Sequence, residues 1–110
     1  MKYVNFLLLL SIFILTPVYS GLQAAPKNAQ AEAAYAKAKA LYDQKKYAEA
    51  FPLMEQAAKM GHSDAQMHLG KMYFNGWGVK HSHETAKIWH EKAAAQGNQE
   101  SINKLKNFRH

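Results

Sequence analysis

Apolar and small residues recur at helical spacing over most of the chain. In one segment, Ala34, Ala38, Leu41 and Tyr42 occupy positions i, i+4, i+7 and i+8. Residues with this spacing lie on one face of an α-helix, so the pattern predicts an amphipathic helix. The pattern returns 31 residues later and, in part, near the C-terminal end; its members there are Ala65, Leu69, Met72 and Tyr73, and then Ser101, Leu105 and Phe108.

A narrower stripe of small residues around one large side chain alternates with the first pattern. It comprises Ala50, Leu53 and Ala57, and again, 36 residues later, Ala86, Trp89 and Ala93. Neither kind of helix can bury its stripe alone, so each pair of helices is expected to form an antiparallel hairpin that stacks on the next. The predicted fold class is all-α: hairpins stacked as a short right-handed α-solenoid of about two and a half repeats.

Three glycines have an architectural explanation. Gly70 lies inside a helical pattern, where glycine costs about 1 kcal/mol relative to alanine, so it predicts a close helix contact, with Ala86 or Trp89. Gly76 and Gly78 stand between two helical patterns, where positive φ angles allow the chain to reverse. A phosphate-binding loop is the alternative, but neither GxGxxG nor GxxxxGKS/T occurs. We therefore predict a turn.

The N-terminal stretch has the three-part build of a secretory signal peptide. Lys2 precedes a strongly apolar run at residues 6–15, and small residues follow near Ser20 and Ala24. A spanning helix needs roughly 20 apolar residues, so we expect residues 1–24 to be a cleaved signal, cut after Ser20 or Ala24, and no permanent membrane anchor. The rest divides into a linker (25–32), a first hairpin (33–61), a full repeat (62–97) and a C-terminal capping helix (98–110).

Composition excludes several kinds of site. The 110 residues contain no cysteine, which rules out disulfides, thiolate metal sites and a lipid-carrying cysteine. The formal net charge is +6, and the lysines are dispersed, with Lys45 and Lys46 as the one adjacent pair. We expect no nucleic acid ligand for an exported protein. Either a solvated basic surface or a face that meets an acidic partner explains the charge.

Histidine spacing does not indicate a metal site. No two of the six histidines have the i, i+4 spacing of a helical zinc motif, and His83 and His90 stand too far apart on a helix for one ion. No serine lies in a strand-turn-helix elbow, and Glu84 and Glu91 suggest no substrate cleft. We predict no cofactor, no metal and no catalytic residue; a metal-dependent hydrolase would require a histidine cluster that spacing does not reveal.

Residues 65–97 resemble one full unit of the Sel1-like repeat family, a relative of the tetratricopeptide repeats. The residues that match the family pattern are Ala65, Leu69, Gly70, Tyr73, Gly76, Gly78, Val79, Ala86, Trp89, Lys92, Ala93, Ala94 and Gly97. Residues 33–61 are similar to a tetratricopeptide-like hairpin, and the tail from residue 98 resembles a closing half unit.

Two positions depart from the pattern. Ser82 replaces a frequent aspartate and is expected to cap a helix, and His90 replaces a frequent tyrosine and is expected to alter a surface.

The resemblance implies a non-catalytic scaffold that binds a protein or peptide. The inner face of an α-solenoid is lined mainly by the first helix of each hairpin, so its residues outside the core stripe are candidates for partner binding. With the turn residues they are Tyr35, Lys39, Gln66, His68, Lys71, Asn75, Trp77 and His81. Export makes this an adaptor of the cell envelope, either periplasmic or secreted. The alternative is an inhibitor or immunity protein whose basic charge complements an exported toxin or cell-wall enzyme.

Overall fold

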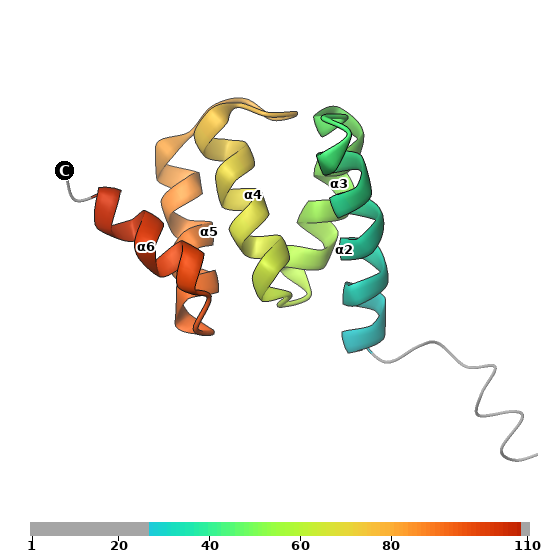
Figure 1. Cartoon of the computed structure of the whole chain (residues 1–110), viewed down its shortest axis with the longest axis horizontal. Helices are drawn as coiled ribbons and strands as arrows, with labels where there is room; N and C mark the ends of the chain where they lie inside the picture. Colours follow the sequence, from blue (N-terminus) through green and yellow to red (C-terminus); the bar gives the residue numbers. More distant parts are fainter. Residues whose placement is uncertain (1–26, 109–110) are drawn as a thin grey trace, which may run out of the picture.

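The computed structural model describes residues 27–108, and this part of the chain forms five α-helices (Figure 1). They are α2 (Lys27–Asp43), α3 (Tyr47–Lys59), α4 (Ser63–Asn75), α5 (His83–Ala95) and α6 (Gln99–Phe108). None of these helices has the length and apolar character needed to cross a membrane. The expected signal peptide and its cleavage sites lie outside the described residues.

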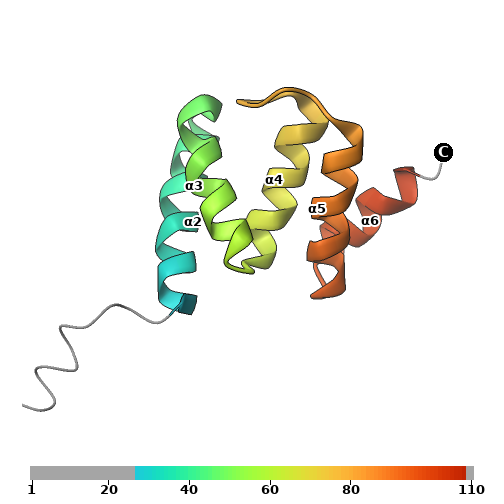
Figure 2. The ribbon, with the colours of Figure 1, turned by 180° about the vertical axis from the view of Figure 1, so that it is seen from behind.

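Each helix packs on its neighbours in the sequence. The contacting pairs are α2 with α3, α3 with α4, α4 with α5, and α5 with α6. Opposite views show α2, α4 and α6 in one layer and α3 and α5 in the other (Figures 1 and 2). A chain of hairpins in which each unit contacts only adjacent units is an α-solenoid, so the predicted all-α architecture is confirmed.

The first helix is longer than the sequence pattern predicted. It begins at Lys27, whereas we expected a linker as far as residue 32. The buried stripe of the helix also extends further toward the N-terminus, because Ala31 is only 4% exposed and lies one turn before Ala34. A single small residue outside the recognised repeat was too weak a signal to predict this first turn.

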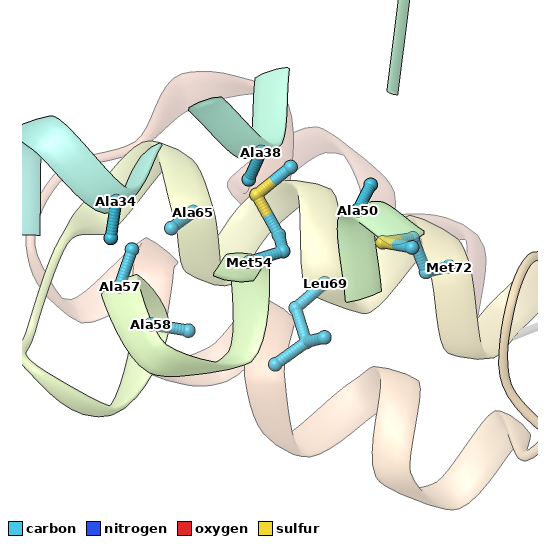
Figure 3. Packing of buried hydrophobic residues seen from close by; sticks show 9 residues of the cluster. All are labelled: Ala34, Ala38, Ala50, Met54, Ala57, Ala58, Ala65, Leu69 and Met72. Carbon is cyan, nitrogen blue, oxygen red and sulfur yellow. The ribbon is translucent and has the colours of Figure 1, made fainter. Parts of the chain in front are cut away.

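The core lies between the two layers and is built mainly from small residues. The cluster in Figure 3 draws on α2, α3 and α4 and comprises Ala34, Ala38, Ala50, Met54, Ala57, Ala58, Ala65, Leu69 and Met72. The alanines allow the helix backbones to approach closely, and Met54, Leu69 and Met72 fill the remaining space. Burial of each of these three larger side chains stabilises the fold by about 1.5–3 kcal/mol. In α5, Ala86 and Ala93 are fully buried as well.

Residues 76–82 form the chain reversal between α4 and α5. Gly76 and Gly78 have φ angles of 70° and 75°, in the left-handed region, so the predicted turn is confirmed. Ser82 ends the turn as the N-cap of α5, where its Oγ accepts a hydrogen bond from the Thr85 N–H at 3.1 Å, as expected. A Cβ at Gly78 would collide with the backbone carbonyl of Tyr47, so this loop lies directly on the start of α3.

Candidate partner-binding face

The helices α2, α4 and α6 lie side by side and form one face of the molecule, here called the α2/α4/α6 face. Ring contacts join the first two helices, because the His68 ring lies 5.7 Å from Tyr35 and 4.8 Å from Tyr42. An ion pair between Lys71 and Glu100 joins α4 to α6. The face therefore has two halves: the first lies between α2 and α4, and the second lies between α4 and α6.

The first half is filled by a row of rings. This aromatic row consists of Tyr35, Tyr42, Tyr47, His68 and Trp77. Trp77 stacks on Tyr47 with ring centroids 4.8 Å apart and an angle of 8°, and Tyr42 meets Tyr47 edge-on at 5.3 Å. The three tyrosines and the tryptophan are half-buried, so their rings pack on one another and still present an edge to solvent. The aromatic row therefore offers a rigid, partly apolar surface.

The aromatic row is uncharged at neutral pH. Burial raises the pKa of the Tyr35 and Tyr42 hydroxyls to about 12, so both remain protonated. Burial also lowers the pKa of His68, whose Nδ1 lies 2.8 Å from the backbone carbonyl of Asp64 and donates to it. Hydroxyl groups on half-buried rings can accept or donate hydrogen bonds to a partner without bringing a charge into the contact.

The second half contains a pocket of about 340 Å³ between α4 and α6, here called the α4–α6 pocket. Two phenylalanines form its apolar walls: Phe74 meets Phe108 edge-on at 5.5 Å and stacks on His83 at 4.5 Å. The full lining comprises Lys71, Phe74, Asn75, His83, His90, Lys104, Asn107 and Phe108. The pocket therefore combines aromatic walls with basic and amide groups.

His90 lies beneath the α4–α6 pocket and is only 1% exposed, so the expectation that it alters a surface was wrong. Its Nδ1 lies 3.0 Å from Ser101 Oγ, and its ring packs against Gly70. The close contact predicted at Gly70 therefore exists, but its partner is His90 rather than Ala86 or Trp89. Burial, followed by the charges of Lys104 and Lys71, lowers the pKa of His90 to about 4, so the ring is neutral at pH 7.

The His90 and Ser101 pair, between α5 and α6, has an apolar counterpart between α3 and α4. A shift of 36 residues relates His90 to Met54 and Ser101 to Ala65, and all four residues are buried. Met54 and Ala65 belong to the hydrophobic core, whereas the equivalent pair between α5 and α6 is polar and hydrogen-bonded. The two helix contacts therefore share a backbone arrangement but differ in the chemistry beneath the face.

Five of the eight sequence-predicted binding residues lie where a partner can reach them. Tyr35 and Trp77 belong to the aromatic row, Lys71 and Asn75 line the α4–α6 pocket, and His81 is exposed beside His83 with ring centroids 4.5 Å apart. These positions are available to a partner.

The other candidates are engaged within the protein. Lys39 forms an ion pair with Asp43 on its own helix at 2.8 Å. His68 and Gln66, predicted as partner-binding residues outside the core stripe, are only 6% and 5% exposed and are therefore buried. Gln66 donates to the Ala58 carbonyl and accepts from Gln96, which ties α4 to α3 and to the C-terminal end of α5. Its position directly after the buried Ala65 places it at the helix crossing rather than on the open face.

Sequence reasoning missed most of the α4–α6 pocket. The residues not anticipated as binding groups are Phe74, His83, His90, Lys104, Asn107 and Phe108. One signal was present: Lys104 and Phe108 are four residues apart and so share a face of α6. Across residues 27–108, no group of three or more histidine, aspartate or glutamate side chains is placed to hold a metal ion.

The stacked hairpins and the open α2/α4/α6 face define a protein of the α-solenoid interaction class. The Sel1 repeat family model matches residues 27–62 and 63–98, and the chain belongs to this family. Sel1 repeats are protein–protein interaction modules. The first hairpin, expected to be tetratricopeptide-like, is therefore itself matched as a Sel1 repeat.

One relative is a protein of Neisseria meningitidis serogroup B that carries the name "uncharacterized protein". It is 41% identical over 66 residues, which is 56% of this chain and 14% of the relative. The chain therefore spans only a small part of that protein's length. The search of solved structures found no significant match.

Proposed function

We propose that this protein is an exported adaptor of the cell envelope that binds a partner protein through the α2/α4/α6 face. Membership of the Sel1 repeat family supports binding to a protein. The signal-like N-terminal stretch of one lysine, an apolar run and small residues supports export. A stoichiometric scaffold needs no reacting group, which agrees with a face built from neutral rings, amides and lysines.

The observation that carries this proposal is the aromatic row. Tyr42 of α2, Tyr47 at the start of α3 and Trp77 of the α4–α5 loop pack their half-buried rings on one another, and His68 of α4 links Tyr42 to Tyr35. Tyrosine and tryptophan are enriched in protein interfaces, where they supply large, rigid contact areas that lose little conformational entropy on binding. Their packing against one another means that the surface is preformed before a partner arrives.

Photo-crosslinking in living cells tests the use of this face, and α2 offers a matched pair of positions. Lys39 lies one turn from Tyr35 on the α2/α4/α6 face, whereas Lys37 is exposed about 200° further round the same helix. A photoreactive residue at position 39 should give a covalent adduct with a partner protein, and the same residue at position 37 should not. Equal adducts at both positions, or adducts at position 37 alone, would contradict the proposed binding face.

Export is tested separately by the mass of the protein recovered from the envelope or the medium. The mature chain should begin at Gly21 or Ala25, after cleavage at Ser20 or Ala24. Recovery of a protein that retains Met1 and stays in the cytoplasm would exclude the exported role, whatever the crosslinking shows.

A further inference from the structure

The α4–α6 pocket has the size and walls of a site for an apolar side chain. Its volume of about 340 Å³ is near the lower end of the range of about 300–1,000 Å³ that is usual for ligand pockets. Phe74, on one wall, is 41% exposed and is one of the two large apolar side chains that are exposed in the described part of the chain. An aromatic or aliphatic side chain entering the pocket would cover Phe74 and Phe108 and remove their apolar surface from water.

The charges around the pocket favour an acidic ligand. No residue that lines it is acidic, and its rim carries Lys71 and Lys104. Lys71 is paired with Glu100, and this hydrogen bond lowers the pKa of the Glu100 carboxyl. Lys104 forms no ion pair with any residue in the range 27–108, so its ammonium group is available. A ligand carboxylate at the rim would pair with the ammonium group of Lys104 and would share that of Lys71 with Glu100.

The polar groups of the pocket suit a peptide backbone. The side chain of His90 closes the bottom of the pocket: it is almost completely buried, its Nδ1 lies beside Ser101 Oγ, and its Nε2 lies against Gly70 of α4. The Asn75 side-chain amide donates to the Lys71 carbonyl and keeps its oxygen as an acceptor, and Asn107 adds a second amide at the rim. Peptide N–H and C=O groups match side-chain amides of this kind.

We infer that the α4–α6 pocket binds an acidic peptide segment of the partner, whose one apolar anchor side chain packs against Phe74 and Phe108 while flanking carboxylates reach Lys104 and Lys71. This inference rests on the proposed function and adds the chemistry of the partner. It also assigns different roles to the two halves of the face: the aromatic row provides area, and the α4–α6 pocket provides selectivity for charge and for one side chain.

A fluorescent peptide tests the inference directly. The probe is a short peptide with one phenylalanine flanked on both sides by aspartates, and its binding to the purified, processed protein is followed by fluorescence anisotropy. Two control peptides carry alanine in place of the phenylalanine or asparagines in place of the aspartates. Both controls should bind at least about fivefold more weakly than the probe, and raising the salt concentration should weaken the probe's binding.

Protein variants locate the site. Lys104→Glu should weaken binding of the probe by about tenfold, whereas Lys106→Glu, the same charge change on an exposed position of α6 outside the pocket, should change it less than about twofold. Phe74→Ala should weaken binding by a similar factor, with Ile88→Ala, which removes the exposed isoleucine of α5, as its control. Thermal melts of all four variants show that each is folded.

The inference is overturned if the probe does not bind, if the asparagine peptide binds as well as the probe, or if the two lysine variants weaken binding equally. The last result would mean general attraction to a basic protein. Failure of the proposed function is a different outcome, because the crosslinking positions lie on α2, away from the pocket. An adduct at position 39 without binding of the probe supports the adaptor role and contradicts the assignment of the pocket to an acidic peptide. Binding of the probe without an adduct supports that assignment and contradicts the proposed binding face.

Discussion

The imidazole ring of His90 fills the space beside Gly70. A Cβ built on Gly70 would lie 2.7 Å from His90 Nε2 and 2.8 Å from Cδ2, closer than side chains ordinarily approach. Gly70 is fully helical and buried within α4, so the glycine is explained by the ring of the neighbouring helix and not by any special backbone angle. The contact fixes the distance between α4 and α5 beneath the α4–α6 pocket.

Gly70→Ala should destabilise the protein. Overpacking against the His90 ring costs about 1–3 kcal/mol and outweighs the gain of about 1 kcal/mol in helix propensity. In a His90→Ala background the ring is absent, so the same substitution should be neutral or stabilising. Urea denaturation of the four proteins gives the coupling free energy between the two positions. Equal destabilisation in both backgrounds would show that the ring is not what excludes a side chain at Gly70.

Stability should fall as the pH is lowered from 7 to 5, and His90 should account for much of the loss. Its folded-state pKa of about 4 lies below the ordinary value of 6.5, so the unfolded chain takes up a proton in this range while the folded protein does not. This difference costs about 2 kcal/mol by pH 5 and is absent above pH 7. The pKa of His68 is lowered by burial too and adds in the same direction.

The double substitution His90→Met with Ser101→Ala isolates the contribution of His90, because it copies the Met54 and Ala65 pair between α3 and α4. The free energy of unfolding, measured in urea at several pH values, should depend less on pH in this variant, and the remaining slope should reflect His68. If parent and variant show the same slope, the buried imidazole does not resist protonation.

The two turn glycines should respond differently to alanine. Gly76→Ala places a side chain in the left-handed region, which costs about 1–2 kcal/mol, and its Cβ would meet His81 Cβ at an ordinary 3.4 Å. Gly78→Ala adds a collision with the backbone at Tyr47 to a similar φ cost, so it should destabilise more. Thermal melts of both variants rank them; a smaller effect at Gly78 would mean that the loop does not press on α3.

Glu100→Gln should increase the affinity of the α4–α6 pocket for the acidic probe peptide. The substitution removes the carboxylate paired with Lys71, so both lysines of the rim become available to the ligand. Binding should tighten by about threefold, and the stability cost should be about 1 kcal/mol or less because the ion pair is partly exposed to solvent. Unchanged or weaker binding would indicate that Lys71 does not contact the ligand.

The architecture could be predicted from the sequence because it depends on periodicity. The helical spacing of the stripes that contain Ala34 and Leu69 is enough to predict both helices. The left-handed turn is predicted by the glycines between two helical patterns. The aromatic row was anticipated in part, through Tyr35, His68 and Trp77. The pocket was not, because it depends on which side chains of α4 and α6 face one another across a helix crossing, and periodicity does not report distances between helices.

His90 shows why a departure from a family pattern was misread. A histidine in place of a tyrosine suggested an exposed polar change, but burial of a neutral imidazole is possible when one nitrogen has a hydrogen-bond partner. That partner, Ser101, occupies an equally unusual position, because the equivalent residue one repeat earlier, Ala65, is an alanine. Comparing the two repeats at both positions together would have revealed the pair.

The loop around Trp77 joins the two repeats mechanically. Its ring stacks on Tyr47, and Gly78 lies against the carbonyl of the same residue, so a segment of the second repeat is seated on the first turn of α3 in the first. In a repeat protein, cooperativity depends on the free energy of such interfaces relative to the intrinsic stability of each unit. Opening one hairpin of this chain would expose both the α3–α4 core and the contact of Trp77 and Gly78 with Tyr47. We therefore expect the two repeats to unfold in a single transition, without a populated state in which one remains folded.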